Sequence, residues 1–343
     1  MNGFWAGLLL VVLSGVMGGS FTIPQKYIRG WAWERSWLLY SVAGMVVFPW
    51  LLVVATVPRP VTVYVHADPL VLARTALYGA GWGIGSVLFG LGVAHVGTAL
   101  AFAIVVSLTA ALGTLAPLAL QHPEHMATGR GGLLFAGLAL VIVGLVLCAR
   151  AGALKEAATP RQDPVEQADT PSRSFYRGLI ICIASGLTSP MLNLSVAFGK
   201  PIAEEAVRRG AAAATASITF LAVAISSGFL VNGGYCLYLL RSNHSWRKGA
   251  EDSGVRNPLF TVVMGFLWMF GMFLYGLGQT QLGDLGPVVG WPLLMTLMVL
   301  TANGWGIATG EWSRAGRLPF YYLQVGNAAM VVALVLISQG AQP

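Results

Sequence analysis

The chain has 343 residues, of which 56% are hydrophobic and only 10% are Asp, Glu, Lys or Arg. A soluble domain carries about 25% charged residues, so this composition excludes a water-soluble globular protein. The net charge of +7 is spread between apolar stretches, a pattern typical of the basic loops of a membrane protein and not of a nucleic-acid-binding surface.

Ten apolar segments are long enough to cross a membrane, because a spanning helix needs about 20 apolar residues. We predict all-α structure, with one helix in each of the segments 3–22, 36–57, 70–94, 98–120, 131–149, 176–197, 213–240, 258–280, 286–308 and 319–339. No Lys or Arg precedes the first segment, so we interpret it as a membrane helix and not as a cleaved signal peptide.

The longest connection, residues 150–175, is charged and rich in Ala, Pro and Gln. It predicts a flexible cytoplasmic linker between a first five-helix unit at 1–149 and a second at 176–343. When Arg74 and Arg177 at the adjoining span ends are counted with the loops, the connections after the odd-numbered helices hold 14 Lys and Arg, and those after the even-numbered helices hold 6. Basic loops stay in the cytoplasm, so both termini are predicted to be periplasmic.

The two units share an internal repeat of the form WxxG-x4-GLG-x4-G. Its fixed positions are Trp82, Gly85, Gly90, Gly92 and Gly97 in the first copy, and Trp268, Gly271, Gly276, Gly278 and Gly283 in the second. Five helices is an odd number, so the second copy of the unit must insert with the opposite orientation. Inverted repeats are typical of secondary transporters with a central substrate site, although a static duplicated scaffold would show the same pattern.

Four further motifs resemble the L-rhamnose–proton symporter family of the drug/metabolite transporter superfamily. They are Phe21-x-x-Pro24-x-Lys26, Trp31-x-Trp33-Glu34-x-x-Trp37, Lys200-Pro201-x-x-Glu204 and Glu311-Trp312-x-x-Ala315-Gly316-Arg317-x-Pro319. The resemblance implies two inverted five-helix repeats in a bacterial inner membrane, which take up a neutral deoxy-sugar such as L-rhamnose together with a proton.

The sequence departs from that family at Gly286-Pro287-Val288, where its enteric members carry an Asp flanked by two Tyr. The alternative is therefore another type of drug/metabolite superfamily member, which imports or exports a different neutral small metabolite. For this alternative, proton coupling is left open. An enzyme is not expected, because we find no catalytic motif such as GxSxG, HExxH or a phosphate-binding loop.

A sugar site needs hydrogen-bonding groups and an aromatic face, and the middle parts of the spans hold almost no ionisable residues. From polar and aromatic residues in the spans, and from the two lysines beside Pro24 and Pro201, we predict a central cavity lined by Lys26, Trp82, Asn193, Lys200, Tyr275, Trp291 and Asn303. Helix–helix hydrogen bonding is the alternative role for the two asparagines.

Proton coupling needs a carboxyl that titrates, and Glu34 and Glu204 are the candidates because they lie in the family motifs. A salt bridge at the end of a span is the alternative role for each. We predict no cofactor and no metal. His122, Glu124 and His125 are interpreted as a solvated loop, since no further ligands accompany them.

Overall fold

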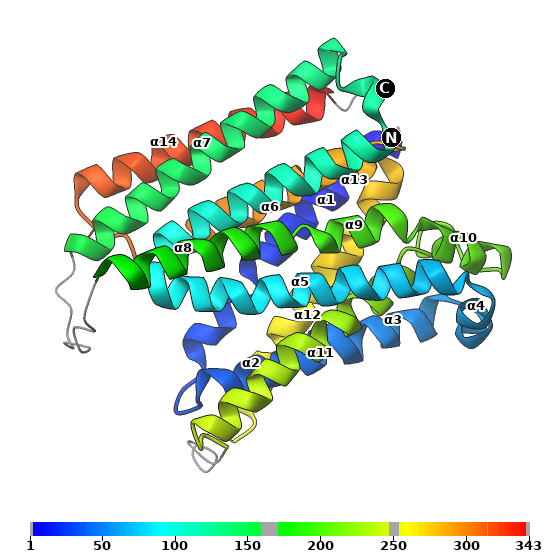
Figure 1. Cartoon of the computed structure of the whole chain (residues 1–343), viewed down its shortest axis with the longest axis horizontal. Coiled ribbons are helices and arrows are strands. Elements are labelled where there is room, and N and C mark those ends of the chain that lie inside the picture. The colour runs from blue at the N-terminus through cyan, green and yellow to red at the C-terminus, as the bar shows by residue number, and fades with distance from the viewer. Residues whose placement is uncertain (1–2, 159–170, 247–253, 314, 341–343) are drawn as a thin grey trace.

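The computed structural model describes residues 3–158, 171–246, 254–313 and 315–340, and these residues form a bundle of long helices (Figure 1). The α-helices are α1 (Gly3–Ser20), α2 (Trp33–Ser41), α3 (Phe48–Thr56), α4 (Pro60–His66), α5 (Pro69–Val96), α6 (Thr98–Gln121), α7 (Gly129–Ala158), α8 (Pro171–Thr188), α9 (Met191–Phe198), α10 (Lys200–Arg208), α11 (Ile218–Ser242), α12 (Arg256–Gln281), α13 (Gly286–Ala308) and α14 (Arg317–Gly340). Short 3₁₀ helices lie at Ile23–Tyr27 (η1) and Pro123–His125 (η3), and a short π-helix lies at Val42–Val47 (η2).

The described part of the chain contains ten helical stretches that are long and apolar enough to cross a membrane. They are Gly3–Tyr27, Trp33–Thr56, Pro69–Val96, Leu100–Gln121, Gly129–Lys155, Phe175–Arg208, Ile218–Ser242, Arg256–Gln281, Gly286–Ala308 and Arg317–Gly340. The prediction of ten spans and all-α structure is therefore confirmed, and the chain is a multi-pass membrane protein. Of the predicted linker 150–175, both ends belong to α7 and α8, and 159–170 lie outside the described residues.

Local sequence signals explain where the helices begin and break. The Asp68 carboxylate accepts a hydrogen bond from the Leu70 N–H at 2.8 Å and caps α5, whose first residue is Pro69, as expected of a helix N-terminus. The same helix ends at Gly97, whose φ of 82° suits glycine.

The first span and the sixth span are both interrupted. The first changes from α1 to the short η1 helix beside Pro24, and the sixth is divided into α8, α9 and α10 at Pro190 and at the Gly199–Pro201 segment. Proline cannot donate the intrahelical hydrogen bond, so a break at these positions follows from the sequence. Lys26 and Lys200, the two lysines beside Pro24 and Pro201, both lie at these breaks.

The packing of these two interrupted spans follows a common plan. Helix α1 packs against α12 and α13, and α8 packs against α5 and α6. Helices α7 and α14 lie side by side along one edge of the bundle (Figure 1). Glycines make the close contacts possible: a Cβ atom at Gly79 of α5 would lie 1.9 Å from the Ala224 carbonyl oxygen of α11.

Candidate functional site

Asn193 of α9, Tyr275 of α12 and Trp291 of α13 form a buried polar cluster, which we call the central cluster. The Tyr275 hydroxyl donates to Asn193 Oδ1 at 2.7 Å. Asn193 Nδ2 donates to the carbonyl oxygens of Gly113 at 2.7 Å and Pro287 at 3.0 Å. The rings of Tyr275 and Trp291 meet edge to face, with centroids 5.9 Å apart.

The sequence of α6 explains why one of these carbonyls is available. In a regular helix the Gly113 carbonyl would accept the N–H of residue 117, but that residue is Pro117. Asn193 replaces the missing donor. Trp291 Nε1 donates to the Thr109 carbonyl of the same helix at 3.0 Å, and a Cβ at Gly113 would lie 2.3 Å from this nitrogen. The central cluster therefore joins α9, α12 and α13 to α6 in this conformation.

A cavity of about 520 Å³ lies next to this cluster, at the end of the bundle where α1 begins and α14 ends (Figure 1). We call it the termini-side cavity. It is bordered by the ends of α6, α9 and α12 and the starts of α10, α11 and α13. Its polar lining residues are Gln121, His122, Lys200, Ser217, Gln279, Thr280 and Asp284. Pro287, whose carbonyl binds Asn193, lines it too, so this cavity borders the central cluster.

A second and smaller cavity of about 250 Å³ lies at the opposite ends of α6 and α13, near the end of α7, and we call it the linker-side cavity. Asn303, Cys148, Glu311 and Trp312 contribute to its wall. Asn303 Nδ2 donates to Asn327 Oδ1 of α14 at 2.7 Å. The central cluster contacts α6 and α13 between the two cavities, so it separates them in this conformation.

An ion pair lies at the linker-side cavity. Lys26 pairs with Glu311 and also donates to Thr309 Oγ1 at 3.1 Å. Lys155 Nζ lies 3.9 Å from the other Glu311 carboxylate oxygen and 4.8 Å from the ring centroid of Trp312. The hydrogen bond from Lys26 is the main reason why the pKa of Glu311 lies below its usual range. The pair joins η1, the end of α7 and the connection between α13 and α14.

The residues predicted to share one central cavity thus lie in separate places. Asn193, Tyr275 and Trp291 form the central cluster, and Lys200 lines the termini-side cavity. Asn303 lines the linker-side cavity, and Lys26 reaches it through Glu311. The Trp82 ring stacks on the Trp268 ring, with centroids 5.5 Å apart and an interplanar angle of 15°.

The two candidate coupling carboxylates differ in their surroundings. Glu34 is only 7% exposed, and its Oε1 accepts from Asn243 Nδ2 at 3.1 Å and from Ser245 Oγ at 2.5 Å. These contacts tie the start of α2 to the end of α11. Glu204 is exposed on α10. Neither residue lines one of the two cavities described above.

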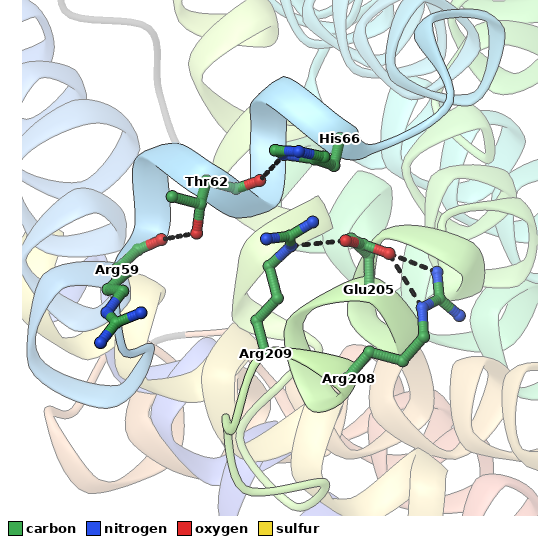
Figure 2. Close-up of polar contacts among 6 residues, drawn as sticks. All are labelled: Arg59, Thr62, His66, Glu205, Arg208 and Arg209. Atoms are coloured by element: carbon green, nitrogen blue, oxygen red, sulfur yellow. Dashed lines mark hydrogen bonds and ion pairs between the residues drawn. The ribbon is translucent and has the colours of Figure 1, made fainter.

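The neighbour of Glu204, Glu205, is the buried carboxylate of α10. It pairs with Arg208 and Arg209 at 2.5 Å each, and Figure 2 shows the two guanidinium groups on either side of it. Helix α4 packs against α10, and in Figure 2 its Thr62 bonds the Arg59 carbonyl, at 2.7 Å. The ion pairs and the packing against α4 hold α10, which is the last part of the sixth span.

The loop with His122, Glu124 and His125 brings three possible metal-ligand atoms within 4.8 Å of one another. Glu124 is highly exposed and lies near both histidines. The geometry equally fits the predicted solvated loop with local ion pairs.

Gln279 and Ser217 were not predicted as site residues, and Glu311 and Trp312 were named only as part of a family motif. Gln279 is one helical turn after Tyr275, so a helical-face argument would have placed it beside the predicted aromatic residue. No comparable signal in the sequence identifies Ser217, because its position depends on how α11 packs against α12.

Comparison with known proteins places this architecture in a family. The family model for the L-rhamnose-proton symport protein (RhaT) matches residues 1–342. The chain belongs to the RhaT family. The curated L-rhamnose-proton symporter of Cronobacter sakazakii is 25% identical over 346 residues, covering 99% of this chain and 98% of that protein. Those of Escherichia coli O1:K1 and Citrobacter koseri are 24% and 23% identical over the same length.

The RhaT family is a family of transporters, so the resemblance inferred from the motifs is confirmed, as is the expectation that the chain is not an enzyme. The match runs through all ten candidate spans and the connections between them.

Proposed function

We propose that the two five-helix units are inverted repeats related by a pseudo-two-fold axis in the membrane plane. The observation that carries this proposal is the stacking of Trp82 on Trp268. These tryptophans occupy the same position of the WxxG repeat, 186 residues apart. Two copies of one position contact each other only close to the axis that relates them.

Contacts away from the axis occur in matching pairs, which supports the same proposal. Ser185 of α8 donates to the Gly85 carbonyl of α5 at 2.7 Å. Gly271, the counterpart of Gly85, lies against the backbone of α1 at Ser14, and a Cβ there would be 3.2 Å from the Ser14 carbonyl. Ser14 and Ser185 begin the Ser-Gly pair that the first and sixth spans share.

A repeat of this kind suits alternating access, in which the units rock against each other around a central site. The termini-side cavity is the larger of the two, while the Lys26–Glu311 pair bridges elements around the linker-side cavity. This conformation fits a state that receives substrate on the termini side. The transition to the opposite state, which would release substrate on the linker side, would open that side, break the Lys26–Glu311 pair and rearrange the central cluster.

The proposed substrate is a neutral deoxy-sugar, L-rhamnose or a similar monosaccharide, taken up across the bacterial inner membrane with a proton. The full-length RhaT match and the names of the relatives support this substrate class. The scarcity of charged residues inside the spans agrees with a neutral substrate, since a charged substrate would need a compensating charge there. Transport of another neutral metabolite is the alternative, favoured by the departure at Gly286–Val288.

For proton coupling we propose Glu34 before Glu204. Glu34 is the buried one of the two and accepts hydrogen bonds from Asn243 and Ser245 after the end of α11, whereas Glu204 is exposed. Glu34→Gln should abolish the response of uptake to a pH gradient while sugar exchange continues. Glu204→Gln is the matched control, because this carboxylate is solvated and should change little.

The decisive experiment is uptake of labelled L-rhamnose into proteoliposomes, with and without a pH gradient and against a panel of neutral monosaccharides. Accumulation of one sugar that depends on the gradient is expected. Equal and gradient-independent entry of all the sugars would contradict symport, and efflux against a concentration gradient would favour the exporter alternative.

The proposed orientation places both termini in the periplasm and the 150–175 linker in the cytoplasm. The split of 14 to 6 Lys and Arg between the two sets of connections supports it. Reporter fusions after Arg173 and Pro343 should read cytoplasmic and periplasmic respectively. A cytoplasmic reading at Pro343 would overturn the orientation.

A further inference from the structure

The termini-side cavity contains polar groups that have no hydrogen-bond partner in the described part of the chain. Gln279 is only 6% exposed and lines the cavity, yet its amide bonds none of the described residues. Ser217, at 1% exposure, has a hydroxyl without a partner. Lys200 and Asp284 also line the cavity, and both side chains are exposed.

The central cluster next to it differs in this respect. Asn193 uses its carbonyl and both of its amide hydrogens, and the Tyr275 hydroxyl and the Trp291 N–H each have an acceptor. A buried polar group without a partner destabilises the fold, because it has lost its hydrogen bonds to water. The buried Ser217 hydroxyl and the buried Gln279 amide, which have no partner among the described residues, therefore point to a polar ligand in this cavity, whereas the central cluster is complete without one.

We propose that the termini-side cavity is the sugar-binding site of this conformation, with the Gln279 amide as its main hydrogen-bonding group. This inference rests on the proposed function. The volume of about 520 Å³ lies in the range of about 300–1,000 Å³ that is usual for small-molecule pockets. An amide both donates and accepts, which matches the hydroxyl groups of a monosaccharide.

The charges and the apolar wall of the cavity restrict the ligand further. Lys200 and Asp284 provide one positive and one negative group, so the site favours a neutral molecule over an anion or a cation. Val196, Ala203 and Phe220 add an apolar surface, which suits the C–H face of a sugar ring and the methyl group of a 6-deoxy sugar.

The position of Gln279 connects this site to the central cluster. Gln279 lies one turn beyond Tyr275 on α12, and Pro287 lines the cavity while its carbonyl binds Asn193. A bound sugar would therefore rest next to the hydrogen bonds that hold α9, α12 and α13 to α6. These bonds are the ones that must rearrange when the substrate moves on.

The test compares Gln279→Met with Gln281→Met in the purified full-length protein. Gln281 is the matched control, because it is an exposed glutamine on the same helix and is not part of the cavity wall. L-Rhamnose binding is measured by isothermal titration calorimetry. Gln279→Met should weaken binding about tenfold or more, as expected for the loss of the hydrogen bonds of one amide, and Gln281→Met should bind like the wild type.

Equal affinity of Gln279→Met and the wild type would overturn the site assignment while leaving the proposed function intact. A wild type that binds no monosaccharide would instead refute the proposed function and this inference with it. A second measurement covers a Gln279 variant that fails to fold. Lys200→Cys should react with a membrane-impermeant thiol reagent, and L-rhamnose should slow that reaction at least several-fold relative to a non-binding sugar. Unchanged labelling in a protein that binds the sugar would likewise overturn the assignment.

Discussion

The hydrogen bond from Asn193 to the Gly113 carbonyl leads to a quantitative prediction for the free energy of unfolding. Asn193→Ala removes three hydrogen bonds of the central cluster, two donated to carbonyls and one accepted from Tyr275. Side-chain hydrogen bonds in membrane proteins contribute about 0.6 kcal/mol on average and up to about 1.7 kcal/mol each. The free energy of unfolding should therefore fall by about 2–5 kcal/mol.

Part of that loss depends on Pro117. In Asn193→Ala the Gly113 carbonyl has no donor, because Pro117 has no N–H to offer. In the double variant with Pro117→Ala, the N–H of residue 117 restores the ordinary helical bond to Gly113. We therefore expect Asn193→Ala to cost about 1 kcal/mol less in the Pro117→Ala background than in the wild type.

The four proteins of this double-mutant cycle are compared by unfolding in mixed micelles with increasing SDS, followed by tryptophan fluorescence. Tyr275→Phe serves as a reference for the loss of a single bond of the same cluster and should cost about 1 kcal/mol. Additive effects of the Asn193 and Pro117 substitutions, within about 0.3 kcal/mol, would refute the idea that Asn193 supplies the donor that Pro117 lacks.

Two other regions give further predictions. Gly79→Ala should destabilise the protein by about 1–3 kcal/mol, because its Cβ would meet a backbone oxygen of α11. Gly90→Ala on the same helix is the control: its Cβ would meet no atom within 4 Å, so this variant should stabilise the protein by about 0.5–1 kcal/mol. Similar unfolding midpoints for the two variants would contradict this packing. Lys26 lowers the pKa of Glu311, so the Glu311 carboxylate is charged at every pH above the usual glutamate pKa of about 4.3. The Lys26–Glu311 ion pair is lost only when the pH falls through the lowered pKa of Glu311. The rate of Cys148 labelling in the linker-side cavity of Glu311→Gln, divided by the wild-type rate at the same pH, should thus be above one and constant from about pH 8 to pH 5.5, because both proteins share the pH dependence of the thiolate. A ratio that falls to one within that range would show that another group controls access.

The candidate site was predictable in type but not in arrangement. Polar and aromatic residues inside apolar spans identify Asn193, Tyr275 and Trp291 as functional candidates, and the structure brings these three together. The sequence did not reveal that their polar atoms bond one another and the carbonyls of α6. The partner of a polar side chain depends on which helices become neighbours, and a single sequence contains no record of that pairing.

The sequence by itself determined the ten spans, the breaks beside Pro24 and Pro201 and the positions of the WxxG repeat, because these depend on local properties: hydrophobic length, the missing N–H of proline and residue identity. Tertiary structure decided which side chains meet. It pairs Lys26 with Glu311 across 285 residues, and it places Gln279 in the wall of a cavity, without a hydrogen-bond partner among the residues that the structure describes. In lipid there is little hydrophobic driving force between helices, so they associate through complementary shape and a few hydrogen bonds. Close glycine contacts and free carbonyl groups therefore decide which helices become neighbours. These interactions form only when the helices pack together, so they cannot be assigned to partners from the sequence.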